Sequence, residues 1–217
     1  NSIQYDSLIA GCIEKTYIDS TINICNTTDL SPNPKPITIS AVLSSNPAFQ
    51  VINPSFPRTL APGECVSMTV RFHGGDKGAV YIDSLTVLSN DTCQRTRIIP
   101  IAGKIKESIF ISDNDGNRLD SLYFGKICVG FASDAEEYLY SNLLNYSIFI
   151  DSIIVPDQYI GKPLKFPIEL KPATGYRPNY FRFLPTKKGN FSDSIIFVVN
   201  ANGCTVRKKL PIYGIGF

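Results

Sequence analysis

The stretches Arg71-Phe72 and Pro100-Ile101-Ala102-Gly103 decide the fold, because they recur about 110 positions later as Arg182-Phe183 and Pro211-Ile212-Tyr213-Gly214. Further matched positions lie between them: Gly78, Asp83-Ser84-Leu85, Asn90 and Cys93 recur as Gly189, Asp193-Ser194-Ile195, Asn200 and Cys204. Solenoid repeats are only about 20–50 residues long. A repeat of this length therefore predicts two whole domains in tandem, each with its own core.

The repeat divides the chain of 217 residues into predicted domains 1–104 and 105–217. Each is close to the commonest domain size and is long enough to bury a hydrophobic core. Within them, Asp120-Ser121-Leu122 matches Asp6-Ser7-Leu8, and the segment from Cys128 to Asn142 aligns without a gap with the segment from Cys12 to Asn26. The two copies therefore share their opening segments as well as their ends.

The first strand differs between the copies. The segment from Ile105 to Ile111 is rich in isoleucine and predicts a strand ahead of the second copy, followed by a tight turn at Asp115-Gly116. Nothing equivalent precedes the first copy. We therefore expect the first domain to lack an edge strand that a preceding domain or another molecule would supply.

The chain reads as strands throughout. Runs such as Val66–Phe72, Tyr138–Ser141 and Ile195–Val199 are rich in β-branched and aromatic residues with partial alternation. Fifteen prolines and fifteen glycines separate these runs at about the spacing of strand-turn-strand units. This pattern predicts an all-β fold of two tandem immunoglobulin-like β-sandwich domains with almost no helix.

Charge and hydropathy exclude two classes of partner. The formal net charge is only +2, and the basic clusters are the short Lys187-Lys188 and Arg207-Lys208-Lys209, so we expect no nucleic-acid partner. No stretch of 18 apolar residues occurs, and the first residues have neither the charged nor the apolar region of a signal peptide. We therefore expect no membrane insertion.

Six cysteines allow fifteen pairings, but the repeat narrows the choice. Cys12 and Cys93 align with Cys128 and Cys204, whereas the counterparts of Cys25 and Cys65 are Ser141 and a position beside Gly175. Cysteines that occur together in one copy and are absent together from the other are most simply partners. The predicted disulfides are Cys25–Cys65, Cys12–Cys93 and Cys128–Cys204.

Three disulfides predict an oxidising compartment, which is the periplasm, the cell surface or the space outside the cell. The alternative for cysteine, a zinc site, requires ligand pairs at close spacing, and no two cysteines here are close enough. The single histidine, His73, lies in a glycine-rich turn and would have to serve alone in any cysteine–histidine couple. We expect no cofactor and no resident metal.

The segment after the predicted strand at 105–111 carries Asp113, Asp115, Asn117 and Asp120. A two-carboxylate glycosidase site needs its acids on either side of a cleft, whereas these lie in one turn, so we expect no enzyme. Turn formation is the simpler interpretation. The same four residues are a weak calcium candidate, although Gly116 is at the wrong position for an EF-hand loop.

Tyrosine and phenylalanine supply all the aromatic content. Tyr138, Tyr140, Tyr176 and Tyr180 form two clusters on predicted strands, where they would form either part of the core or an exposed contact surface for a glycan or a protein. Alternate aromatic residues on a strand more often face the core.

These motifs resemble a known family. The segment Phe124-Gly125-Lys126-Ile127-Cys128-Val129-Gly130 is similar to the opening motif of immunoglobulin-like domains of the abnormal-spindle/hydin type, which include the bacterial choice-of-anchor D repeats. Other matching positions are Asn142, Leu60-Ala61-Pro62-Gly63-Glu64, Val70-Arg71-Phe72, Gly78, Ser89-Asn90-Asp91 and Pro100-Ile101-Ala102-Gly103. The first copy departs from the pattern at His73-Gly74-Gly75 and at Leu8-Ile9-Ala10-Gly11-Cys12. The matching residues belong to turns and cores, so the resemblance concerns the fold more than an activity.

The resemblance implies an array of β-sandwiches in a large exported bacterial surface protein. The resulting hypothesis is a non-enzymatic structural or adhesive segment whose partners are neighbouring domains of the same or identical chains, and also other surface proteins or glycans. One alternative is a filament or coat subunit that assembles by β-strand addition at the incomplete edge of the first domain. Another is a carbohydrate-binding module that uses exposed tyrosines.

Overall fold

The structure is a computed structural model that describes residues 2–27, 34–75, 77–134, 136–161 and 163–217. The described residues form strands, turns and bends, and they contain no helix. None of these segments could therefore cross a lipid bilayer as a helix. The fold is all-β, in agreement with the sequence.

The chain forms two compact units. The first contains residues 1–8 and 15–105, and the second contains residues 9–14 and 106–217. The division after residue 105 lies beside the boundary expected after residue 104. Residues 9–14, however, belong to the second unit, although they precede nearly all of the first unit in the sequence.

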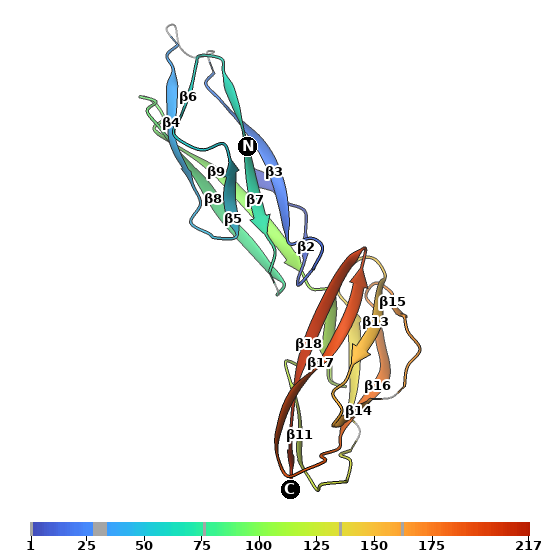
Figure 1. The fold of residues 1–217 in the computed structure, drawn as a ribbon. Helices are drawn as coiled ribbons and strands as arrows, with labels where there is room; N and C mark the ends of the chain where they lie inside the picture. The colour runs from blue at the N-terminus through green and yellow to red at the C-terminus, as the bar shows by residue number, and fades with distance from the viewer. Residues whose placement is uncertain (1, 28–33, 76, 135, 162) are drawn as a thin grey trace. The chain divides into compact units, whose positions relative to one another are not determined.

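The first unit has two sheets (Figure 1). The larger has the order β1-β9-β8-β4-β6, with β2 also beside β9, and the smaller has the order β3-β7-β5. The strands are β1 (Ile3–Gln4), β2 (Leu8–Ile9), β3 (Tyr17–Cys25), β4 (Ile37–Leu43), β5 (Phe49–Asn53), β6 (Arg58–Leu60), β7 (Cys65–His73), β8 (Ala79–Ser89) and β9 (Thr96–Lys106). β1 runs parallel to β9, whereas the other strand pairs whose direction is defined are antiparallel.

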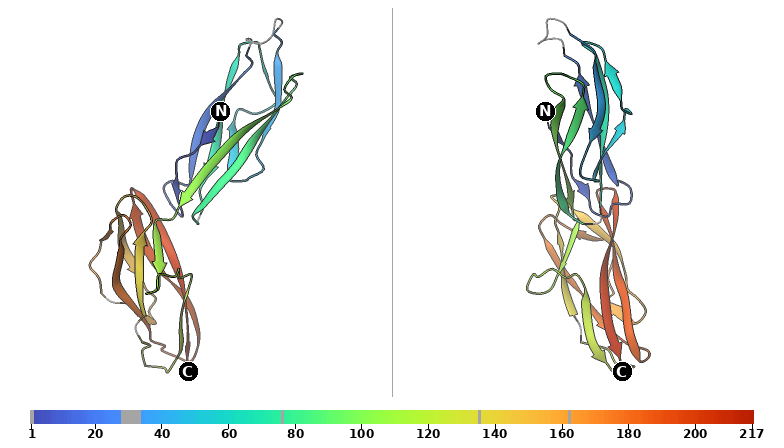
Figure 2. Two further views of the ribbon diagram at one scale, coloured as in Figure 1. Left: turned by 180° about the vertical axis from the view of Figure 1, so that it is seen from behind. Right: turned by 90° about the vertical axis from the view of Figure 1, so that its left-hand side faces the viewer.

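The second unit repeats this plan. Its sheets have the orders β11-β18-β17-β13-β15 and β10-β12-β16-β14. The strands are β10 (Ile109–Ser112), β11 (Leu122–Ile127), β12 (Glu136–Asn142), β13 (Ile148–Ile154), β14 (Tyr159–Gly161), β15 (Ile168–Leu170), β16 (Gly175–Phe183), β17 (Gly189–Ala201) and β18 (Cys204–Gly216). The additional views show the two layers of each unit from other sides (Figure 2).

The strands of the two units correspond in order, and one strand of the second unit has no counterpart among the strands described in the first. β1 and β2 together take the place of β11, and β9, β8, β4 and β6 take the places of β18, β17, β13 and β15. In the smaller sheets, β3, β7 and β5 match β12, β16 and β14. Only β10 has no counterpart among the described residues of the first unit.

Alternating side chains explain why these segments are strands with one buried face. In β7, Val66, Met68, Val70 and Phe72 are at most 4% exposed, whereas the residues between them point to the other face. β-branched and aromatic residues fit such a pleated, half-buried surface. The buried face of each smaller sheet packs against the larger sheet, and the core lies between them.

The same aromatic cluster joins the two sheets in both units. In the first, the Phe72 ring lies 5.5 Å from that of Tyr5, 5.1 Å from that of Phe49 and 5.6 Å from that of Tyr81. In the second unit, the ring of Phe183 meets the three rings at the matching positions, Phe124, Tyr159 and Phe191. Tilted and edge-on contacts at these distances are favourable beyond the area that they bury.

The repeated glycine in the closing strand makes room for this phenylalanine. A Cβ atom on Gly103 would lie 2.6 Å from the Phe72 ring, and one on Gly214 would lie 2.5 Å from the Phe183 ring. Neither glycine has a positive φ angle, so space rather than backbone conformation requires it. The two sequence motifs that repeat most clearly are therefore the two sides of one contact between sheets.

A buried asparagine provides a second repeated link between the sheets. The side-chain amide of Asn26 donates to the carbonyls of Lys35, at 2.8 Å, and Leu60, at 3.1 Å. At the matching position the Asn142 amide donates to the Leu170 carbonyl at 2.9 Å. Because buried polar groups need partners, this asparagine fixes the end of β3 or β12 against the opposite sheet.

We expect the substitution Gly103→Ala to destabilise the first unit by about 2 kcal/mol, because the added methyl group overlaps the Phe72 ring and forces the core to shift. Chemical denaturation of the oxidised protein would measure the change. The matched control is Gly75→Ala, where the added Cβ meets its nearest atom at an ordinary 3.6 Å. Equal stability of the two variants would contradict the steric role of Gly103.

Candidate functional site

The structure contains two disulfide bonds. One joins Cys25 to Cys65, which face each other in the β3–β7 pair, and the other joins Cys12 to Cys204. Cys93 and Cys128 are exposed and unbonded. The predicted pair Cys25–Cys65 is thus present, whereas the predicted pairs Cys12–Cys93 and Cys128–Cys204 are replaced by a single bond across a sequence separation of 192.

The parallel pairing of β1 with β9 and of β11 with β18 keeps the cysteines of the two predicted pairs far apart. β11 runs parallel to β18, so Cys128, just after β11, lies at the end of β18, whereas Cys204 lies at its start. The 13 residues of β18 span roughly 40 Å. A disulfide needs Cα atoms about 4.4–6.8 Å apart. In the first unit Cys93 likewise precedes the start of β9, whereas β1 and β2 lead towards its end.

The alignment of Cys12 with Cys128 was wrong by three positions. Gly11 and Gly130 have positive φ angles of 68° and 83° and are the third residues of matching turns. The amide of Cys12 closes the first turn by donating to the Ile9 carbonyl, and the amide of Phe131 closes the second by donating to that of Cys128. Cys128 therefore matches Ile9, and Cys12 lies at the other end of the turn.

Residues 9–14 are held on the start of β18 by hydrogen bonds as well as by the disulfide. The amide of Ile13 donates to the Thr205 carbonyl at 3.1 Å, and the amide of Thr205 donates to Glu14 Oε2 at 2.6 Å. The bond from Thr205 lowers the pKa of the Glu14 carboxyl below its usual value. Cys12, Glu14 and Cys204 are the one group of potential metal ligands that the described residues bring together, and its two sulfur atoms are bonded to each other.

The weak calcium candidate has a structural role. Asp113 accepts hydrogen bonds from the amides of Asp115 and Asn117 at 3.0 and 2.8 Å and from the Asn117 side chain at 3.0 Å, which lower the pKa of its carboxyl. Asp120 instead pairs with Arg118 at 3.2 Å. Within the described residues the three carboxylates do not gather at metal-ligand distances. The loop is therefore a turn organised by Asp113.

Sequence reasoning missed a charged cluster beside β10. Glu107, only 12% exposed, accepts two hydrogen bonds from Arg118 at 2.8 and 2.9 Å and lies 3.4 Å from Lys208 in β18. The hydrogen bonds from Arg118 lower the pKa of the Glu107 carboxyl, an effect that partial burial opposes and Lys208 reinforces. These residues are far apart in the sequence, so no local pattern indicates the cluster.

The four candidate tyrosines differ in burial. Tyr138 and Tyr140 are 4% and 0% exposed and form part of the core of the second unit. Tyr176 is half-buried, and the side chain of Tyr180 lies outside the described residues. The two tyrosines on β12 therefore offer no surface to a glycan.

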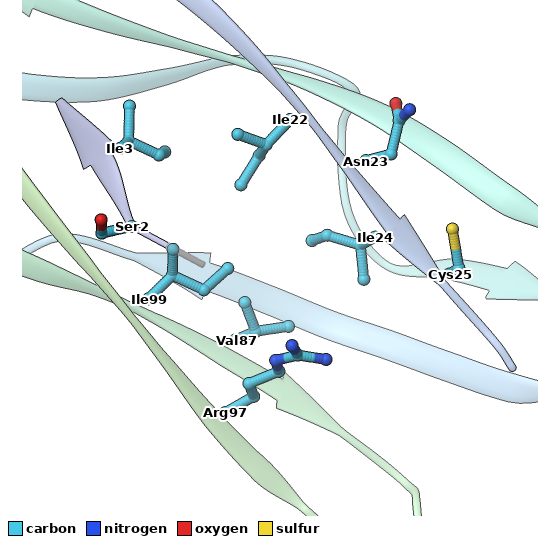
Figure 3. Close-up of a pocket in the computed structure, with 9 residues that line it drawn as sticks. All are labelled: Ser2, Ile3, Ile22, Asn23, Ile24, Cys25, Val87, Arg97 and Ile99. Carbon is cyan, nitrogen blue, oxygen red and sulfur yellow. The ribbon is translucent and has the colours of Figure 1, made fainter. Parts of the chain in front are cut away.

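The first unit contains an apolar groove between its two sheets. A cavity of about 260 Å³ is lined by Ser2, Ile3, Ile22, Asn23, Ile24, Cys25, Val87, Arg97 and Ile99. Ile22 and Ile24 of β3 point towards Ile99 and Val87 of the opposite sheet, whereas Asn23 and Cys25 point away (Figure 3). Among the described residues, β3 is paired on one edge alone, by β7.

This groove lies beside a strand edge that is unpaired within the described part of the chain. The free edge of β3 presents backbone N–H and C=O groups, and the space behind it is apolar except for Ser2 and the Arg97 guanidinium. An added strand would satisfy the backbone groups and place alternate side chains in the cavity. The sequence repeat predicts the missing edge strand, but it does not predict the cavity or the basic residue beside it.

Comparisons with protein-family models and with curated protein sequences find no match. Solved structures similar to this chain include a protein of unknown function from Porphyromonas gingivalis W83, with 10% identity over 99% of this chain and 96% of that chain and a TM-score of 0.37. They also include E. coli alpha-2-macroglobulin, with 12% identity over 75% of this chain and 10% of that chain and a TM-score of 0.39. The Pseudomonas aeruginosa CupB2 chaperone has 8% identity over 95% and 97% of the chains and a TM-score of 0.29. These similarities are too low to assign a family.

Alkylation of the folded, unreduced protein with iodoacetamide should label Cys93 and Cys128 and leave the other four cysteines unmodified, because exposed thiols react as thiolates whereas bonded sulfurs do not. Peptide mapping by mass spectrometry reads the result. Reduction before alkylation is the control and should label all six cysteines. A bridged Cys12–Cys93 or Cys128–Cys204 peptide would contradict the assignment.

Proposed function

We propose that this chain is a non-enzymatic structural segment of an exported bacterial surface protein, made of two tandem immunoglobulin-like β-sandwiches of the abnormal-spindle/hydin type. Two observations support the proposal. The disulfides indicate an oxidising, non-cytoplasmic compartment. The conspicuous polar groups serve structural contacts, since Asp113 organises a turn, Glu14 binds a backbone amide, and Glu107 forms ion pairs.

The Cys12–Cys204 bond is the main support for a structural role. It closes a covalent loop across a sequence separation of 192, so most of both units lies inside the loop. Tension applied to the two ends of the chain passes through the sulfur–sulfur bond and can extend only the short segments outside it. A segment built in this way resists lengthening under load even if its sheets open.

The two alternative functions, assembly by strand addition and glycan binding, have unequal support. The groove of the first unit supports assembly by strand addition, because it presents a free strand edge beside an apolar cavity. A glycan-binding module has less support, because Tyr138 and Tyr140 are buried. We therefore propose a structural role with a strand-binding groove, rather than glycan recognition.

Single-molecule pulling on the two ends of the oxidised protein should release at most about 100 Å of chain, the reach of the residues outside the loop. Adding a reductant that cleaves the bond should release roughly 690 Å more, which is the separation of 192 residues at ~3.6 Å each.

The variant Cys25→Ser/Cys65→Ser is the matched control, because it removes a disulfide inside the loop and leaves Cys12–Cys204 intact. Its oxidised form should show the same short extension as the wild type. Release of several hundred ångströms from the oxidised wild type would refute the load-bearing proposal.

A further inference from the structure

The second unit shows how the edge that is free in the first unit becomes covered. There β10 pairs antiparallel with β12, so that Ile109 faces Asn142 and Ser112 faces Leu139. Ile109 and Ile111 are 1% and 3% exposed, because they enter the space between the two sheets. The side chain of Tyr140, on the neighbouring strand, is fully buried.

The matching place in the first unit has no such strand among the described residues. The equivalent asparagines Asn26 and Asn142 fix the correspondence, so Ile22 and Ile24 of β3 match Tyr138 and Tyr140 of β12. Tyr138 and Tyr140 are buried, but Ile22 and Ile24 are half-exposed. The difference in burial therefore lies on β3, at the edge that matches the edge of β12 covered by β10.

The groove occupies the same place. Its lining includes Ile22–Cys25 of β3, and three of the four matching residues of β12, Leu139, Tyr140 and Ser141, pair with β10. Across the space, Val87 and Ile99 match Phe197 and Leu210 of the second unit. The cavity therefore lies where the isoleucines of a strand like β10 would enter.

A basic residue at the groove is a second feature that fits a strand like β10. Arg97, at the groove, occupies the position in β9 that Lys208 occupies in β18. In the second unit Lys208 lies 3.4 Å from Glu107, which stands two residues before β10. A strand that enters the groove with an acidic residue at the same place would bring that residue to Arg97.

We infer that the groove between β3 and β9 is an acceptor site for an extended strand of the β10 type that is not already paired within a unit of its own. The strand runs antiparallel to β3, places two isoleucine-like side chains in the cavity and pairs an acidic residue with Arg97. The β10 of a second copy is not a free donor, because it is already paired with its own β12. The inference is independent of the load-bearing role, since it concerns binding by the unloaded protein.

A capped synthetic peptide of residues 106–113, which contains Glu107 and the whole of β10, is the probe. It should bind saturably to the oxidised 217-residue protein and shift the backbone amide signals of residues 22–25 in NMR spectra. The same peptide with Ile109→Asp and Ile111→Asp should not bind detectably, because its charged side chains would enter an apolar cavity.

The peptide could instead displace β10 from β12 in the second unit. Swapping the charges of Arg97 and Glu107 distinguishes that outcome from binding in the groove. The protein variant Arg97→Glu should bind the peptide about fivefold more weakly, and a Glu107→Lys peptide should restore the affinity. Arg95→Glu is the matched control, since Arg95 is exposed on the same hairpin but is not in the groove lining, and it should bind as the wild type does.

Three outcomes of the peptide experiments would overturn the inference. They are no binding at millimolar peptide, equal binding of the peptide with two aspartates, and insensitivity to Arg97→Glu. Analytical ultracentrifugation tests the remaining occupant. A dimer that dissociates in an Ile24→Lys variant would show that a second copy covers the groove instead, which also overturns the inference as stated.

Discussion

The packing of one phenylalanine ring against one glycine holds the two sheets of each unit in place. Phe72 and Phe183 extend from the smaller sheet to the closing strand of the larger sheet, where Gly103 and Gly214 leave the space that each ring occupies. Three further rings surround each phenylalanine. The position of the sheets determines which strand edges are covered, and therefore where the groove of the first unit lies.

Sequence reasoning predicted the parts of the fold that local pattern determines. Alternation in segments such as Val66–Phe72 predicted strands, and the repeat predicted two units with an extra strand in the second. The sequence places the opening motif of the first copy at Leu8–Cys12, whereas its structural counterpart is Tyr5–Gly11, because Tyr5 replaces the phenylalanine found at position 124. Structure shows the correspondence, since Tyr5 and Phe124 have matching places in the two aromatic clusters.

The features that were missed depend on contacts between distant residues. The pairing of Cys12 with Cys204 follows from the parallel strand at the start of each copy and from residues 9–14 belonging to the second unit. Neither property leaves a local signal. Glu107, Arg118 and Lys208 likewise meet only in the folded chain. The comparison of the copies could suggest a missing strand, but only the half-exposed Ile22 and Ile24 show that its place is open.

Hydrogen exchange of the two equivalent strands measures whether the β3 edge is unpaired, because backbone amides on an unpaired edge exchange without a structural opening. In the free, oxidised protein we expect fast exchange of the outward-facing amides of residues 23–25 in β3. We expect slow exchange of the matching amides of residues 139–141 in β12, which β10 covers. Equally slow exchange at both strands would show that the β3 edge is already paired and that the groove is not open.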